Sequence, residues 1–363
     1  MTMKPRTRVL TTLRRQVPDR VPKTFSLSPA QLERFRIETG AEDPAEYFDF
    51  EMRHAPTHYS GAPGPPSRSA ADFEQYYDEL PARAEIDEWG IAWLPGSFYH
   101  FRDFIPPLRN ANTVEEIAAY PYPDLTAEGR FEGYADEVQR LQDAGYAVVG
   151  SVSPVGGTVF WPAYKLRGME TLLVDMCIHP ELAAVLMDKV TEISVTLARK
   201  VTSLGVDILW LADDFGTQQD LIVGPPMWQA WFKPRLRRVI ASAKQVNPDI
   251  IVAFHSDGNV EKIVPDLIDI GVEVLNPVQP ECMDPAKLKA DYGEQLAFWG
   301  AIGTQTTLPF GTPQEVKAVV KERIETVGVN GGFVIAPTHV VEPEVPWENI
   351  LAFVEAVEEY GVY

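Results

Sequence analysis

The chain has 363 residues, of which 45% are hydrophobic and 23% are charged, a balance typical of a folded globular protein. Its 52 acidic and 32 basic side chains give a net charge of −20, which disfavours nucleic acid and anionic membranes as partners. Two cysteines are too few for a disulfide framework. The chain shows no signal-peptide pattern and no apolar stretch approaching about 20 residues, so we expect a cytoplasmic protein.

Residues 1–135 have an irregular pattern that is rich in proline. This pattern indicates a helical, loop-rich N-terminal extension rather than a regular repeat of strands and helices. Two strands are expected within it, at Val21–Ser26 and near Tyr47–Met52. We therefore treat residues 1–363 as one domain with an irregular first part.

After residue 135, short apolar segments alternate with amphipathic ones, a pattern that predicts parallel strands joined by helices. The predicted strands are Ala147–Val152, Val206–Ala212, Ile250–Phe254, Val272–Leu275, Leu296–Ala301 and Gly332–Ala336. With the two N-terminal strands the count is eight, which predicts an α/β fold of the (β/α)8 TIM-barrel type. An open doubly wound sheet is the alternative, but no glycine-rich phosphate motif follows any strand.

Helix starts are marked at three places in the second half of the chain. Thr312 to Glu315 has the residues of a capping box with proline at the first helical position, and Pro346 opens a last amphipathic segment. A further helix is expected from Val260, because apolar residues recur there at helical spacing.

The segment His255–Asn259 (HSDGN) ends the most apolar of these strands. Side chains two residues apart on a strand point the same way, so His255 and Asp257 are expected on one face. An imidazole and a carboxylate held together can bind a divalent metal or move a proton. The alternative is that His255 is a hydrogen-bonded core histidine.

Other polar or small residues follow the predicted strands, whose carboxyl ends form the active-site face of such a barrel. The predicted site residues there are Asp213 and Asp214 as acid/base groups, Gly156, Gly157, Asn276, Gln279 and Gln305 as substrate contacts, and His339 beside His255. Asp213 or Asp214 is equally well explained as a helix cap, and Asn276 as part of a turn. The other four histidines, His54, His58, His100 and His179, are expected to be structural.

Several segments in order resemble the superfamily of uroporphyrinogen decarboxylases and corrinoid-dependent methyltransferases. They are Pro18–Pro22 (PDRVP), Asp87–Gly90 (DEWG), Asp213–Gln218 (DDFGTQ), His255–Asn259, Leu275–Pro280 (LNPVQP) and Pro346–Ile350 (PWENI). The resemblance covers nearly the whole chain and favours the methyltransferase-like branch. It implies a (β/α)8 barrel, in agreement with the strand count.

The methyltransferase branch implies a zinc site made by a His-x-Cys pair and a later cysteine, with a methyl group moved between a small methylated substrate and a corrinoid on a partner protein. On this chain those positions fall at His255, at Asp257 in place of the first cysteine, and at His339 in place of the second. The expected ligands of a divalent metal are therefore His255, Asp257 and His339. Zinc is the first expectation, and the harder ligand set also admits manganese or iron.

The decarboxylase branch implies metal-free chemistry on a tetrapyrrole, with arginines that neutralise its carboxylates. Those arginines are absent after the first predicted strand, where the sequence reads Lys23–Ser28 (KTFSLS). Decarboxylation is therefore the alternative function, and a non-catalytic barrel that binds a corrinoid protein is a third. The sequence leaves the oligomeric state open, with a homodimer among the arrangements considered.

Overall fold

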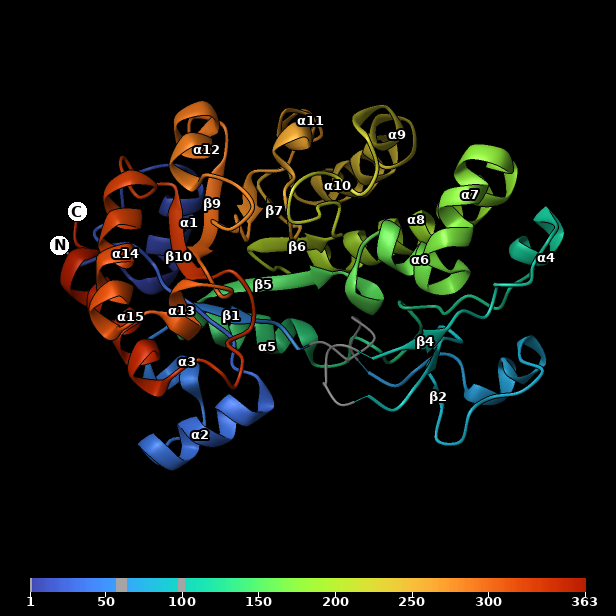
Figure 1. The fold of residues 1–363 in the computed structure, drawn as a ribbon, viewed down its shortest axis with the longest axis horizontal. Helices are drawn as coiled ribbons and strands as arrows, with labels where there is room; N and C mark the ends of the chain where they lie inside the picture. The colour runs from blue at the N-terminus through green and yellow to red at the C-terminus, as the bar shows by residue number, and fades with distance from the viewer. Residues whose placement is uncertain (1, 57–63, 97–101) are drawn as a thin grey trace.

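The computed structural model describes residues 2–56, 64–96 and 102–363, and its centre is a seven-stranded parallel sheet (Figure 1). The strands, in their order across the sheet, are β1 (Met52–His54), β5 (Ala147–Val152), β6 (Ile208–Ala212), β7 (Ile251–His255), β8 (Val274–Asn276), β9 (Ala297–Ile302) and β10 (Phe333–Pro337). The six predicted central strands are confirmed, each to within two residues.

The extended segment 22–24 lies against β10 and supplies an eighth side of the curled sheet. Its Lys23 forms a parallel bridge with Ile335, and the two neighbouring backbone hydrogen bonds measure 2.9 and 3.3 Å. The backbone N–H of Lys23 also donates to the Glu51 carboxylate, next to the start of β1. The architecture is thus the predicted TIM-barrel-like α/β fold.

Two N-terminal details of the prediction were wrong. The segment Val21–Ser26 forms one isolated bridge, at Lys23, rather than a full strand, and on its other side the Lys23 N–H meets the Glu51 side chain instead of a backbone ladder. The second strand was placed too early: Tyr47 ends a short helix begun by the Asp43 cap and Pro44, and β1 starts only at Met52.

Helices surround the sheet, as Figure 1 shows. In chain order they are α1 (Pro5–Leu13), α2 (Pro29–Thr39), α3 (Pro44–Tyr47), α4 (Val114–Ala118), α5 (Tyr134–Asp143), α6 (Phe160–Arg167), α7 (Met169–Ile178), α8 (Pro180–Ser203), α9 (Pro225–Trp231), α10 (Lys233–Val246), α11 (Val264–Asp269), α12 (Pro285–Tyr292), α13 (Thr307–Phe310), α14 (Pro313–Thr326) and α15 (Trp347–Tyr360). The predicted capping box at Thr312 and Glu315 is present, and Pro346 caps α15. The helix expected from Val260 begins as a 3-10 turn, Glu261–Ile263, and becomes α-helical at Val264. None of the helices in the described ranges is long and apolar enough to cross a bilayer.

A small antiparallel sheet lies apart from the barrel strands, in the part of the chain predicted to be irregular (Figure 1). Its strands are β2 (Glu85–Ile86), β3 (Ala92–Trp93) and β4 (Phe104–Ile105). Beside it, the buried Arg130 guanidinium makes a bidentate ion pair with Glu88 at 2.9 and 3.0 Å. This pair ties together two parts of the N-terminal extension that are 42 residues apart in the sequence.

The barrel interior is packed at one end and open at the other. Inward side chains of the strands form one apolar cluster with Val9 and Leu13 of α1. Helix α1 therefore closes the end where the strands begin. Any ligand that enters the barrel must come from the end where the strands finish, which is the end that carries the predicted site residues.

Candidate metal centre at the barrel mouth

Three neighbouring strands bring the predicted site residues to the same level. In the parallel register, Ala212 of β6 lies opposite His255 of β7, and His255 lies opposite Asn276 of β8. Asp214 follows β6 by two residues, and Asp257 follows β7 by two residues. Because adjacent parallel strands end side by side, four polar groups gather at one point of the mouth.

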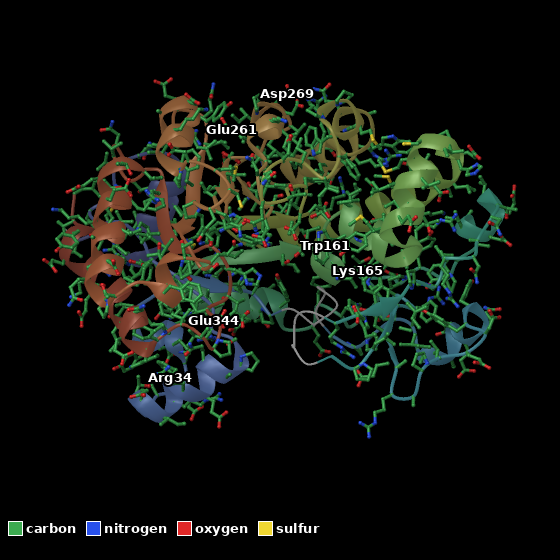
Figure 2. All side chains as sticks on the ribbon, in the orientation of Figure 1. Arg34, Trp161, Lys165, Glu261, Asp269 and Glu344 are labelled. Carbon is green, nitrogen blue, oxygen red and sulfur yellow. The ribbon has the colours of Figure 1, made fainter. Side chains whose placement is uncertain are left out.

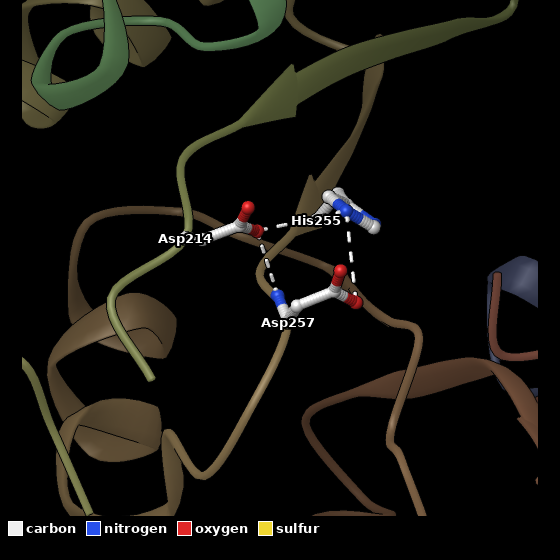
Figure 3. A group of neighbouring side chains, drawn as sticks. All are labelled: Asp214, His255 and Asp257. Atoms are coloured by element: carbon white, nitrogen blue, oxygen red, sulfur yellow. Dashed lines mark hydrogen bonds and ion pairs between the residues drawn. The ribbon is translucent and has the colours of Figure 1, made fainter. Parts of the chain in front are cut away.

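Asp214, His255 and Asp257 form a compact cluster, which Figure 3 shows. One ligand atom from each residue lies within 4.8 Å of the other two. His255 Nε2 is 3.7 Å from Asp214 Oδ1 and 3.9 Å from Asp257 Oδ1. These separations are too long for direct hydrogen bonds and leave room for an ion between the three groups.

Asn276 fixes the orientation of the imidazole. Its Nδ2 donates to the Trp299 carbonyl at 2.8 Å, so its Oδ1 is the acceptor for His255 Nδ1 at 2.6 Å. The proton of a neutral His255 therefore sits on Nδ1, and the lone pair of Nε2 faces the two carboxylates. A hydrogen bond on the far nitrogen is the usual way in which proteins orient a metal-binding histidine.

The cluster is electrostatically incomplete without a cation. Burial opposes a charged His255, but the carboxylates of Asp257 and Asp214 outweigh it and raise the pKa of the imidazole above its ordinary value. Burial raises the pKa of Asp257, although the charge of His255 acts in the opposite direction. Asp257 Oδ1 is buried and has no hydrogen-bond partner among the residues that the structure describes. A divalent ion would satisfy this oxygen and both carboxylates.

A cavity of about 370 Å³ opens beside the cluster inside the barrel mouth. Its lining comes from segment 24–26 and from all seven strands or the residues that follow them. The residues are Thr24, Phe25, Ser26, His54, Ala55, Val149, Ser151, Trp210, His255, Asn276, Trp299, Ala336, Pro337, Thr338, His339 and Val340. The volume lies within the range of pockets that bind small organic molecules. Among the described residues no Arg or Lys lines it, and the sequences of segments 57–63 and 97–101 contain none.

His339 lines this cavity but is not in the cluster of possible metal ligands. Its charge lowers the pKa of Asp257, although burial dominates that pKa and raises it, so the two side chains are electrostatic neighbours. The predicted ligand set of His255, Asp257 and His339 thus differs from the observed cluster by one residue. The third member of the cluster is Asp214, which was expected as an acid/base group, and not His339.

Asp213 is not part of the cluster, although it is adjacent to Asp214. Its fully buried carboxylate accepts hydrogen bonds from the backbone N–H of Val159 at 2.8 Å and of Trp161 at 2.9 Å, at the start of α6. Burial raises the pKa of Asp213 to about 7, although the backbone hydrogen bonds act against that rise. The side chain caps the start of α6, so the helix-cap alternative holds for an earlier helix and not for the helix that follows Asp213.

Gly156 and Gly157 form the turn that receives Asp213. A Cβ at Gly157 would lie 2.4 Å from Asp213 Oδ1 and 2.4 Å from Trp161 Cβ, so only glycine fits. Gly156 has a φ of 95°, and its neighbour Val155 has a φ of 45°. Neither glycine is among the described residues that line the cavity. In the structure they allow this turn to pack closely against α6.

Of the remaining predicted substrate contacts, Gln279 and Gln305 lie in the loops and do not line the cavity, whereas Asn276 does. Gln279 is buried, and its Oε1 accepts a hydrogen bond from the Gly258 N–H at 2.6 Å, which fixes the loop that carries Asp257. Gln305 is exposed, and its backbone N–H donates to Glu281 at 3.2 Å. Asn276 lines the cavity, but its side chain is engaged with His255 and Trp299.

The sequence prediction missed the aromatic wall of the cavity. The rings of Trp210 and Trp299 lie 4.9 Å apart, Trp210 stacks on His255 at 5.6 Å, and His54 lies 6.4 Å from Trp210. His54, expected to be structural, therefore borders the site, whereas His179 is exposed at the start of α8. His58 and His100 lie outside the described residues. Alternate side chains of a strand point to the same face, and this alternation along β6 and β9 could have identified the two tryptophans as inward-facing.

Lys165 of α6 is a second buried polar group near the mouth. Its ammonium donates to the Val155 carbonyl at 2.7 Å and lies 4.5 Å from the Trp161 ring and 4.9 Å from the Trp93 ring. Burial lowers the pKa of Lys165 to about 8, against the attraction of Asp87 and Asp214. Figure 2 shows Trp161 and Lys165 beside the tip of β5.

Comparisons with known proteins agree with this architecture. The family model described as uroporphyrinogen decarboxylase (URO-D) matches residues 96–360. A methylcobamide:CoM methyltransferase MtaA from Methanosarcina barkeri is 26% identical over 263 residues, which cover 69% of this chain and 73% of the relative. A uroporphyrinogen decarboxylase from Nostoc punctiforme is 24% identical over 320 residues, which cover 79% of this chain and 87% of the relative. A methyltransferase structure from Methanosarcina mazei has a TM-score of 0.68 at 22% identity and covers 99% of both chains, which shows the shared fold.

Proposed function

Because the chain belongs to the uroporphyrinogen decarboxylase family, we propose that it is a metal-dependent methyltransferase, acting between a small methylated substrate and a corrinoid protein or another acceptor. The observation that carries this proposal is the cluster of Asp214, His255 and Asp257 beside a cavity of about 370 Å³. The relatives include enzymes of both branches, methyltransferases and decarboxylases. The choice between the two rests on the residues of the mouth.

The donor set fits a divalent metal. One imidazole nitrogen and two carboxylates are ordinary ligands of zinc, manganese and iron, and the buried, unpartnered Asp257 Oδ1 is the kind of atom that an ion satisfies. His339, on the rim of the same cavity, is the candidate for a fourth ligand. Zinc remains the first choice, with manganese and iron as alternatives because no thiolate is present in the cluster. A bound ion would act as a Lewis acid toward the heteroatom that carries the methyl group.

The chain's own side chains would prepare the substrate for transfer. Asn276 holds the His255 ring so that Nε2 faces the two carboxylates. The backbone N–H of Asp257 donates to Oδ1 of Asp214 at 2.8 Å and so holds that carboxylate in place. The rings of Trp210 and Trp299 form an apolar wall against which a small substrate can rest with little water around it. The open end of the barrel leaves the reacting methyl group accessible to a macromolecular acceptor.

Decarboxylation of a tetrapyrrole is the less supported alternative. A substrate with many carboxylates needs several cations, and the described cavity lining has no Arg or Lys. The carboxylates of Asp214 and Asp257 would repel such a substrate instead. A non-catalytic barrel is also less supported, because converging ionisable groups with raised pKa values are typical of reactive sites.

The test is a methyl-transfer assay with cob(I)alamin as the acceptor and a panel of small methyl ethers and methylamines as donors, followed by the absorbance of methylcobalamin. The wild-type protein should form methylcobalamin with at least one donor, and Asp257→Asn should reduce the rate by about 100-fold or more. Ser203→Ala, on the surface at the end of α8, is the matched control. Carbon dioxide release from a porphyrinogen by the metal-free protein would favour decarboxylation instead.

A further inference from the structure

A second cavity lies at the opposite end of the barrel from the metal centre. It has a volume of about 730 Å³ and is lined by residues from the end of α1, from α12, and from the segments that precede β9 and β10. The residues are Arg15, Ala286, Lys289, Ala290, Asp291, Gly293, Glu294, Gln295, Thr326, Val329 and Asn330. Because α1 closes the barrel interior at this end, the cavity is separate from the mouth.

Arg15 lines this cavity, and one nitrogen of its guanidinium lacks a partner in the described structure. Its Nη1 is buried and has no hydrogen-bond partner among the described residues. The backbone of Arg15 has a φ of 61°, a left-handed conformation that a long side chain rarely adopts. A buried guanidinium N–H without an acceptor is costly, and an anion bound next to Arg15 would lower that cost.

Lys289 of α12 places a second cation at the same cavity. Its ammonium donates to the Gly331 carbonyl at 2.6 Å, which leaves two of its three donors available. A Cβ built at Gly332 would lie 3.3 Å from Lys289 Nζ and 3.6 Å from Arg15 Cγ, so both side chains border one glycine. Burial lowers the pKa of Lys289, and a nearby anion would reverse that effect.

The carboxylates of the lining do not cancel these two cations. Asp291 is already paired with Lys287, whose ammonium lies 2.8 Å from it. Glu294 is exposed. The lining therefore offers donors from Arg15 and Lys289, and no ion pair joins either side chain to a carboxylate in the described structure.

We propose that this cavity binds a small oxyanion, a phosphate or carboxylate group, through Arg15 and Lys289. A guanidinium offers paired N–H donors to such a group, and the ammonium adds a second charge-assisted bond. The site is remote from the barrel mouth and does not depend on the proposed methyl transfer. Its occupant is either a free anion or the anionic part of a small metabolite.

The test is isothermal titration calorimetry of the untagged full chain at pH 7 and low ionic strength, with inorganic phosphate in one series and malonate in the other. Wild-type protein should bind at least one of the two saturably, and the series that responds identifies the preferred anion. Arg15→Gln should weaken binding by about tenfold or more. Arg14→Gln, the exposed neighbouring arginine, should bind like the wild type.

Lys289→Gln provides a second variant that does not touch the strained backbone at Arg15, and it should also weaken binding. Circular dichroism of each variant checks that it is folded. Absence of saturable binding of both anions to the wild type would overturn the proposal. So would equal affinity in wild type, Arg15→Gln and Lys289→Gln, because that result would place the bound anion elsewhere, including at the metal centre.

Discussion

Asn276 and His255 are joined by a hydrogen bond of 2.6 Å from the imidazole Nδ1 to the amide Oδ1 across the β7–β8 pair. The direction of this bond follows from the second bond of Asn276, in which its Nδ2 donates to the Trp299 carbonyl. The relationship leaves Nε2 as the free nitrogen of His255, directed at Asp214 and Asp257 (Figure 3). The proposed metal site therefore depends on a residue that need not touch the metal.

Replacement of Asn276 should weaken metal binding without removing a ligand. Asn276→Ala removes the acceptor that holds Nδ1–H, and loss of such an outer partner typically costs about 10- to 100-fold in affinity. Asn276→Asp keeps an acceptor for Nδ1–H but loses the bond donated to the Trp299 carbonyl, so it should bind metal more tightly than Asn276→Ala. Competition with a chromophoric chelator measures both variants. Equal affinity in Asn276→Ala and wild type would show that Asn276 does not orient the ligand.

The same substitution at two adjacent residues should have different effects. Both oxygens of Asp213 accept a backbone N–H at the start of α6, and Asp213→Asn replaces one of these oxygens with an NH2 group, which cannot accept. The substitution should therefore lower the free energy of unfolding by about 1–3 kcal/mol. Asp214→Asn keeps an oxygen for the Asp257 N–H, so it should cost under about 1 kcal/mol but should weaken metal binding. Chemical denaturation and metal analysis of both proteins give the comparison. Similar stability losses in the two variants would contradict the separation of roles.

Gly157→Ala should destabilise the protein through a clash with Asp213. The added Cβ would lie 2.4 Å from both Asp213 Oδ1 and Trp161 Cβ, and overpacking of this kind typically costs about 1–3 kcal/mol. Gly224→Ala is the control, because a Cβ there would approach only Pro226, at 3.9 Å. Thermal unfolding measures both. An unchanged midpoint for Gly157→Ala would mean that this turn can move away from α6.

Acid should remove the contribution that the ion pair of Asp19 with Arg8 makes to the free energy of unfolding. The guanidinium donates two hydrogen bonds to Asp19, at 2.7 and 2.9 Å, and lowers its pKa to about 2, against an ordinary value of 3.8. A lowered carboxyl pKa stabilises the fold above the unfolded-state pKa, and this stability is lost as the pH falls from about 4 to about 2. Because solvent screens this partly exposed ion pair, Asp19→Asn should cost only on the order of 1 kcal/mol at pH 7 and progressively less below pH 4.

Denaturant titrations of wild type and Asp19→Asn at several pH values follow this difference. Asp249→Asn, at an exposed position after α10, is the control substitution. A gap between wild type and Asp19→Asn that stayed constant through this pH range would mean that the titration of Asp19 is not linked to folding.

The barrel could be predicted from sequence because its strands are short apolar runs with a strong β preference. The run Ala147–Val152 coincides with β5, and the runs ending near Ala212 and Phe254 predicted β6 and β7 to within two residues. Residues after parallel strands must meet at one end of the barrel, so the meeting of Asp214, His255 and Asp257 also followed from the pattern. The N-terminal strands were harder to place, because their pairing depends on side chains such as Glu51.

The individual roles at the mouth could not be read in the same way. Asp213 and Asp214 are identical in composition and adjacent in sequence, yet one caps α6 and the other faces His255. That difference arises from the path of the chain after β6, which the pattern of apolar and polar residues does not predict. The pairing of Asn276 with His255 likewise joins residues 21 positions apart through the strand register.

The metal content of the purified, untagged protein tests the central claim most directly. Elemental analysis should find about one zinc, manganese or iron per chain, either as purified or after reconstitution and dialysis, and His255→Ala should lose it while remaining folded. No metal in the wild type after reconstitution would contradict the proposed site. Metal retained by His255→Ala at the wild-type amount would also contradict it, because the ion would then be bound elsewhere.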